Sequence, residues 1–312
     1  MNFKDPLLYA IPAFLLCILT EWLVDVYTHK KGGRYSYNGK DFLASAGTGI
    51  GVIILSPLAK MLGFFILYLV FDCTMQIRLK LLGYRYLQFV WWVWILAFLA
   101  DDFTFYWHHR ICHTVRLFWA DHIAHHSSNH YNLGTGIRNS WGIMFYKVFF
   151  WLWMPLTGFQ PLMIVTVMSI SGIYQFLLHT QYIPRLGLME KIMNTPVLHQ
   201  VHHARNHKYL DRNHGGILII WDKLFGTFED YDTEKPPQFG VTKDPESYNP
   251  LRIVSHEYIN MFSDVKRAGS FRNKLKYIFY SPGWSHDGSN KTAKQLQKEA
   301  ILNKDKTENQ TA

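Results

Sequence analysis

The sequence predicts an all-α, polytopic integral membrane protein with about four to six membrane segments and a cytosolic, histidine-rich cap that holds two metal ions. Apolar residues make up 49% of the 312 residues and charged residues only 18%, against about 25% in a typical soluble domain. The apolar residues form long blocks, and residues 148–178 carry no charge. The 16 histidines are crowded mainly into residues 108–130 and 179–214.

The first two apolar blocks indicate membrane-spanning helices. Residues 7–27 are typical of an uncleaved membrane anchor, because the segment ends in acidic and bulky side chains rather than in a small-residue cleavage site. Residues 42–71 carry Lys60 as their only charge, and Ser56-Pro57 predicts a break in the block. This block is longer than the roughly 30 Å hydrocarbon layer, so it predicts one kinked crossing or a shallow hairpin, and we favour the single crossing.

The third block precedes the first histidine cluster, and the fourth block separates the two clusters. Residues 86–107 lead directly into the first histidine cluster, and residues 148–178 are interrupted by Pro155, Gly158 and Pro161. We expect the fourth block to enter the membrane and return. The histidines before and after it would then lie on the same face of the membrane.

Charge and cysteine content suggest where that face lies. Four basic residues fall in residues 28–41 and three in residues 72–86, which favours a cytoplasmic position for the first segment and for all the histidine clusters. The net charge of +9 is concentrated between apolar blocks and in the tail, so it indicates flanking of a bilayer rather than binding of nucleic acid. The 3 cysteines form no C-x-x-C pair, which argues against a disulfide framework and a thiolate zinc site.

Composition divides the chain into four regions. Residues 1–85 are expected to form the N-terminal membrane segments and residues 86–240 the catalytic domain. Residues 241–285 are rich enough in aromatic side chains to fold as a C-terminal cap segment. Residues 286–312 are polar and expected to be disordered, except for a possible solvated or interfacial helix over residues 292–304.

The histidines follow three spaced motifs. The first is H-x3-H, whose imidazoles share one face of a helix that continues the third apolar block. The second and third are both H-x2-H-H, which presents ligands at i, i+3 and i+4 within one turn. One further histidine stands where the returning hairpin leaves the membrane. The candidate metal ligands are His109 and His113, then His122, His125 and His126, then His199, His202 and His203, together with the single His179.

Imidazole ligands without cysteine suit iron, zinc, copper or nickel and argue against an iron–sulfur cluster. Eight or nine imidazoles exceed what one ion accepts, so we predict two metal ions. Asp102, Tyr106 and His109 fall at i, i+4 and i+7 on one helical stripe, so Asp102, with Tyr106 beside it, is expected to orient a ligand imidazole. The remaining histidines are expected outside the ligand set: His108, His130, His207 and His214 close to it, and His29, His256 and His286 on the surface.

A polyhistidine metal pair at a membrane surface favours activation of O2 by two ferrous ions and attack on an unactivated C–H bond of a lipid. Hydroxylation and desaturation share the first hydrogen abstraction, so a desaturase stays open as an alternative. A histidine-rich membrane metal transporter or sensor is a second alternative, although no apolar block has the polar stripe of an ion path. The sequence contains no C-x2-C pattern or G-x-G-x-x-G motif, so the electrons are expected from a separate redox partner.

These motifs resemble the fatty acid hydroxylase and sterol desaturase superfamily of membrane-bound non-haem di-iron enzymes, most closely its alkylglycerol monooxygenase-like branch. The three histidine boxes match those of the family in type and order. Further similar stretches are residues 102–110, 125–132, 178–180, 194–196, 221–227 and 281–284. The resemblance covers roughly residues 90–285, about two thirds of the chain.

The resemblance implies that the box histidines bind two iron ions (Fe2+/Fe3+) and that O2 oxidises a lipid such as an alkylglycerol, a fatty acyl chain or a sterol-like lipid. It also implies an external electron donor, for which tetrahydrobiopterin, a ferredoxin or a cytochrome b5-like protein fits. Two positions depart from the family pattern. Thr114 stands where the branch has an acidic residue, and His214 replaces the tyrosine of the usual N-Y-G sequence.

Overall fold

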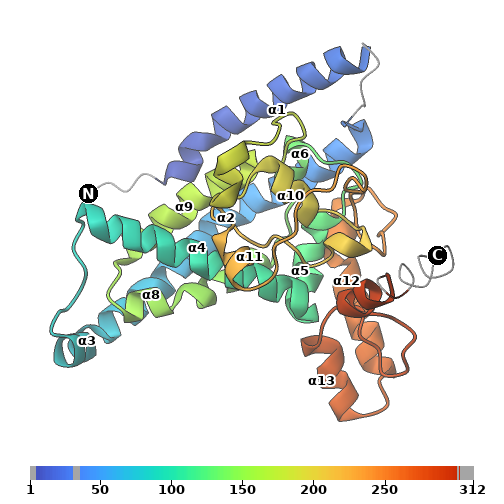
Figure 1. Ribbon diagram of the computed structural model, residues 1–312. Helices are drawn as coiled ribbons and strands as arrows, with labels where there is room; N and C mark the ends of the chain where they lie inside the picture. The colour runs from blue at the N-terminus through green and yellow to red at the C-terminus, as the bar shows by residue number, and fades with distance from the viewer. Residues whose placement is uncertain (1–4, 31–35, 301, 303–312) are drawn as a thin grey trace.

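The computed structural model describes residues 5–30, 36–300 and 302. Across these residues the secondary structure is helical, with two isolated β-bridges and no named strand. The all-α prediction is therefore confirmed. Long helices occupy one part of the molecule, and short helices joined by irregular segments form a cap at one end of them (Figure 1).

The first two apolar blocks form α1 (Pro6–Lys30) and α2 (Gly39–Cys73). Both are long and apolar enough to cross a membrane. Only 11% of the most apolar window of each is buried, so most of their large apolar side chains face outward. α2 continues through Pro57 without interruption, which agrees with a single crossing rather than a hairpin.

Two acidic residues near the end of α1 explain why charges occur in an apolar segment. Glu21 accepts hydrogen bonds from the Tyr37 hydroxyl at 2.6 Å and the Leu133 amide at 2.7 Å. Asp25 accepts from the amide and the hydroxyl of Ser36. Both carboxylates are buried, so they tie the end of α1 to the start of α2 and to the cap.

The third block forms α4 (Trp91–Thr114), which follows the short α3 (Met75–Leu82). One face of α4 packs in the largest apolar core, where Val93 and Ala97 are fully buried. The opposite face carries exposed apolar side chains such as Trp91, which is 74% exposed. The C-terminal half of the same helix carries the first histidine motif, so α4 joins the apolar part of the molecule to the cap.

The fourth block is divided, as its proline and glycine residues predict. After α7 (Ile143–Tyr146), which precedes the block, it forms most of the 3-10 helix η1 (Lys147–Trp151) and then α8 (Trp153–Leu156) before the chain turns. Gly158 lies at the turn with φ +98, a left-handed conformation that favours glycine. The chain then continues as α9 (Pro161–Leu177), which contacts α1, α2 and α4 and ends just before His179.

The cap is built on α5 (Arg116–His126), which contacts α4 and α12. The other helices of this region are α6 (Leu133–Gly136), η2 (Gly187–Lys191), α10 (Pro196–His202), η3 (His207–Tyr209), α11 (Ile220–Leu224), α12 (Pro250–Arg267) and α13 (Phe271–Phe279). In the tail, residues 293–300 are helical, as the sequence suggested for part of residues 292–304. Residues 303–312 lie outside the described residues.

Candidate metal centre

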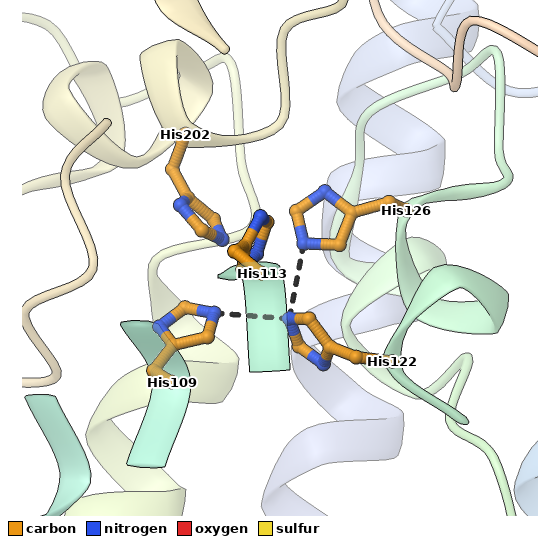
Figure 2. Close-up of side chains that lie close together, drawn as sticks. All are labelled: His109, His113, His122, His126 and His202. Carbon is orange, nitrogen blue, oxygen red and sulfur yellow. Dashed lines mark hydrogen bonds between the residues drawn. The ribbon is translucent and has the colours of Figure 1, made fainter. Parts of the chain in front are cut away.

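Five candidate ligands converge in one buried group (Figure 2). His109 and His113 extend from α4, His122 and His126 from α5, and His202 from α10. Each offers a ring nitrogen, and these nitrogens all lie within 4.8 Å of one another. His122 Nε2 lies 3.0 Å from His109 Nε2 and 3.1 Å from His126 Nε2. We call these five residues the first histidine group.

The other four candidate ligands form a second histidine group: His125, His179, His199 and His203. His179 Nε2 is at the centre, 3.1 Å from His125 Nε2, 3.2 Å from His203 Nε2 and 3.3 Å from His199 Nε2. The sequence placed His179 at the exit of the hairpin, and the structure brings it into this group. All nine predicted ligand residues are therefore found in the two groups.

Each H-x2-H-H box contributes to both groups. In α5, successive residues are rotated by about 100° around the helix axis, so His122 and His126 point in nearly the same direction while His125 points to one side. His122 and His126 accordingly belong to the first group and His125 to the second. The third box is divided in the opposite sense, with His202 in the first group and its two neighbours in the second.

Main-chain carbonyls fix the orientation of four of these rings. His109 Nδ1 lies 2.8 Å from the carbonyl oxygen of His214, and His202 Nδ1 lies 2.8 Å from that of Arg212. His125 Nδ1 lies 2.8 Å from the carbonyl oxygen of Arg138, and His179 Nδ1 lies 2.9 Å from that of Gln175. A neutral imidazole carries one N–H, and a carbonyl can only accept, so Nδ1 donates in each case. The Nε2 lone pair then points into the group, the arrangement typical of metal-bound histidine.

The two groups fit metal ions. Facing Nε2 atoms lie 3.0 to 3.3 Å apart, and two nitrogens bound to one ion at about 2.1 Å would be separated by about 3.0 to 3.4 Å. The Nε2 atoms of His113 and His202 are buried and have no hydrogen-bond partner within the part of the chain that the structure describes. Burial lowers the pKa of His125 to about 4, so this imidazole is neutral near pH 7 and able to bind a cation.

A buried ion pair supports the second group. Arg138, whose carbonyl accepts from His125, is 2% exposed. Its guanidinium donates to the Asp41 carboxylate at 2.6 Å and to the hydroxyls of Ser45 and Ser127. Because Asp41 and Ser45 lie in the first turns of α2, the end of this apolar helix holds the backbone that orients a candidate ligand.

Asp102 differs from the expectation. Its carboxylate accepts from the amides of Ile217 and Leu218 and from Trp221 Nε1, at 2.7, 3.1 and 2.9 Å, and no histidine is among its described hydrogen-bond partners. The physical reason is distance: residues i and i+7 share a stripe but lie about 10 Å apart along the helix axis. Asp102 therefore holds the segment that follows His214 rather than an imidazole.

Asp222, which the sequence analysis did not single out, holds the other end of that segment. Its carboxylate accepts from the amides of His214 and Gly215, both at 2.7 Å. The carbonyl of His214 in turn orients His109. Tyr106 is also close by: its hydroxyl lies 2.9 Å from Thr227 Oγ1, which donates to Asp222 at 2.7 Å.

His214 was expected outside the ligand set, but its ring lies directly beside the first histidine group. It is 1% exposed, its two ring nitrogens have no hydrogen-bond partner among the described residues, and its ring centroid lies 5.1 Å from that of His113. The departure from N-Y-G marked this position, but no spacing rule connects it to the boxes. His207 is exposed and belongs to neither group, as expected of a histidine outside the ligand set.

Two further histidines occupy buried positions outside the groups. His256 is 8% exposed, so the expectation of a surface residue is wrong; its Nδ1 lies 2.9 Å from the carbonyl of Ile253 within α12. α12 packs on α5, a tertiary contact that local sequence does not reveal. His108 is buried against Phe150 and Cys112, on the side of α4 away from His109.

Comparison with known proteins connects this centre to a family. Alkylglycerol monooxygenase from Homo sapiens is 40% identical over 206 residues, and the Xenopus tropicalis enzyme is 37% identical over 207 residues. Each alignment covers 65% of this chain and 45% of the relative. Ornithine lipid hydroxylase OlsE from Rhizobium tropici is 26% identical over 149 residues, or 47% of this chain and 45% of that protein.

The chain thus spans less than half the length of these curated relatives. No solved structure matches it. The fatty acid hydroxylase family matches residues 94–227, which include the two histidine groups and both buried carboxylates that hold the segment after His214. Residues 94–227 of this chain therefore belong to the fatty acid hydroxylase family, which confirms the resemblance carried by the histidine boxes.

Proposed function

We propose that this protein is a membrane-bound, O2-dependent lipid hydroxylase that uses two iron ions. The observation that carries the proposal is the pair of buried all-imidazole groups, five residues in one and four in the other, in a chain similar to alkylglycerol monooxygenases. Bound iron supplies the activation of O2 that an unactivated C–H bond requires. The protein supplies the ligand geometry and a site from which water is excluded.

The first iron would be held by the first histidine group and the second by the second histidine group. The carbonyl contacts at Nδ1 keep the Nε2 lone pairs of His109, His202, His125 and His179 directed inward. Asp102 and Asp222 act through the backbone, because they hold the segment whose carbonyl orients His109. These carboxylates are positioning residues.

We further propose that the chain crosses the bilayer about four to six times and that its cap faces the cytoplasm. α1 and α2 each form one crossing, and α4 and the α7–α9 hairpin complete the membrane part. The exposed apolar faces of α2 and α4 support this arrangement, since such side chains are not stable in water over so long a surface. The hairpin supports a common side for both groups, because His125 precedes it and His179 follows it.

The substrate is proposed to be a lipid, with an alkylglycerol as the first candidate and a fatty acyl or sterol-like lipid as the next. The similarity to alkylglycerol monooxygenases and to an ornithine lipid hydroxylase supports this order. Electrons come from a separate donor, either tetrahydrobiopterin or a protein such as a ferredoxin or a cytochrome b5-like carrier. Desaturation on the same centre is the second candidate reaction.

Product analysis tests the proposed function. The full chain is purified in detergent with iron and incubated with O2, an alkylglycerol, a fatty acyl lipid or a sterol, and each candidate donor in turn. Hydroxylation adds one oxygen atom to the lipid, whereas desaturation removes two hydrogen atoms, and mass spectrometry distinguishes the two. Incorporation of 18O from labelled O2 is expected for hydroxylation. Iron-loaded protein that consumes no O2 with any lipid and donor would contradict the proposal.

A further inference from the structure

The C-terminal helices expose apolar side chains that the proposed oxidation does not use. On α12, Leu251, Ile259 and Phe262 are 63%, 63% and 53% exposed. At about 100° per residue they fall within one narrow face of the helix. α12 packs on α5, where Ile253 joins the same core cluster as Ala124. Ile253 and Met261, both outside the exposed face, are fully buried.

The next helix repeats the pattern. On α13, Phe271, Leu275 and Phe279 follow each other at intervals of four residues and are 74%, 41% and 54% exposed. Tyr277, on the other side of the helix, is buried. α12 and α13 contact each other, and α13 projects from the body of the molecule (Figure 1). We call the exposed apolar faces of these two helices the α12–α13 surface.

Basic residues accompany this surface. Residues 265–283 contain five lysines and arginines and no acidic residue: Lys266, Arg267, Arg272, Lys274 and Lys276. Around the axis of α13, Arg272 and Lys274 fall on either side of the apolar stripe. An apolar stripe with basic flanks is the pattern of a helix that lies in the interface of an anionic membrane.

The surface is continuous with the apolar face of α2. A methyl group built on Gly47 would lie 2.5 Å from Pro250, the first residue of α12, so the two helices touch there. Leu43 and Ile50, one turn to either side of Gly47, are 70% and 57% exposed. Leu251, next to Pro250, therefore lies beside the outward face of a helix proposed to cross the bilayer.

We propose that α12 and α13 form an interfacial anchor that lies on the bilayer surface beside the start of α2. The apolar stripes insert among the upper parts of the acyl chains, and the flanking bases contact anionic phospholipid headgroups. A second copy of this chain fits the surface less well, because two such basic faces repel each other. The inference rests on the proposed membrane insertion of α2 but not on the reaction or its substrate.

Site-directed fluorescence in lipid nanodiscs tests the anchor. A Cys17→Ser, Cys73→Ser background removes the two cysteines with some exposure and keeps Cys112, which is buried. Single cysteines at Ile259 or Leu275 then carry an environment-sensitive fluorophore. The matched control is Asn260→Cys, which is exposed on α12 but outside the stripe. Ile54→Cys on α2, where the side chain is 69% exposed, reports membrane insertion itself.

Lipids with a quencher on the upper part of the acyl chain are expected to quench the labels at Ile259 and Leu275 at least about twofold more than the label at Asn260. Quenching at Ile54 with no difference between Leu275 and Asn260 would overturn the anchor and leave membrane insertion intact. Absence of quenching at Ile54 would overturn both. Stripe labels that respond to protein concentration rather than to quencher lipid would also overturn the anchor, in favour of self-association.

A charge-reversal variant tests the headgroup contact. Arg272→Glu with Lys274→Glu is expected to reduce quenching at Leu275 in phosphatidylserine-containing nanodiscs by about twofold or more, while quenching at Ile54 stays unchanged. Lys291→Glu with Lys294→Glu, in the polar tail, is the matched control and is expected to have no effect. Equal quenching at Leu275 in the reversed and unreversed protein would overturn the role of anionic lipid.

Discussion

At the scale of single residues, the direction of Nε2 separates a candidate ligand from a neighbouring histidine. His179 has Nδ1 held by the Gln175 carbonyl and Nε2 within 3.3 Å of three other imidazoles. His207 follows the third box by only a few residues, yet its side chain is exposed. His207 is thus much nearer to a box in sequence, but only His179 faces a proposed metal.

We expect His179→Ala to lose turnover and about one iron per chain, because the second group would keep three imidazoles. His207→Ala, the matched control, is expected to keep activity and iron within experimental error. Iron analysis and lipid oxidation assays on both variants check this, and circular dichroism confirms that the fold is retained. Normal iron content in His179→Ala would remove this residue from the ligand set.

The spacing of the boxes predicts eight residues of the two groups, because helical periodicity places i, i+3 and i+4 within one turn, whereas His179 was predicted from its position at the exit of the hairpin. Spacing did not predict the partners that orient the rings. The contact between His109 and the His214 carbonyl joins residues 105 positions apart. Spacing also did not predict the partners of Asp102, which was expected to orient an imidazole. Its partners come from a segment of the cap that only the tertiary fold brings to α4.

At the scale of helices, the start of α2 is coupled to the second histidine group through Asp41, Arg138 and the carbonyl that accepts from His125. The apolar pattern predicted α2 but gave no reason to connect it with a metal ligand. The apolar pattern was also compatible with a hairpin in this block, whereas α2 continues through Pro57 unbroken. A proline in a long helix is tolerated where neighbouring packing compensates for the lost hydrogen bond.

Asp41→Asn is expected to destabilise the protein by about 3 to 5 kcal/mol, because it leaves a buried guanidinium without its counter-charge. We also expect weaker iron binding in the second group, since the Arg138 backbone loses its restraint. Thermal unfolding and iron titration measure the two effects. Lys291→Gln breaks an ion pair whose lysine side chain is 50% exposed, and it should change stability by less than about 1 kcal/mol. Equal behaviour of the two variants would contradict the coupling.

At the scale of the whole molecule, collecting nine imidazoles in a buried centre makes stability depend on pH. The pKa of His125 is lowered to about 4 by burial, against an ordinary value of 6.5. Between these values the unfolded chain binds a proton at this residue that the folded chain does not bind. The stabilising contribution is therefore present above pH 6.5 and is lost as the pH falls toward 4.

Metal-free protein in detergent is expected to unfold at a progressively lower temperature as the pH is reduced from 7 to about 4.5. His125→Gln, which removes one of the titrating imidazoles, should show a weaker dependence over the same range. Scanning calorimetry or intrinsic tryptophan fluorescence records both curves. A melting temperature that rises on acidification would show that the histidine groups are not held neutral in the fold.

The most direct test of the two-iron centre is the iron content of the purified full chain and of two variants, each of which reduces one group to three imidazoles. We expect about two iron ions per chain in the unmodified protein. His113→Ala with His202→Ala leaves three imidazoles in the first group, and His203→Ala leaves three in the second. Each variant should retain about one ion, and the two should differ in their Mössbauer spectra because different irons remain. One iron or none in the unmodified protein, or the same remaining iron in both variants, would contradict a centre built from two separate histidine groups.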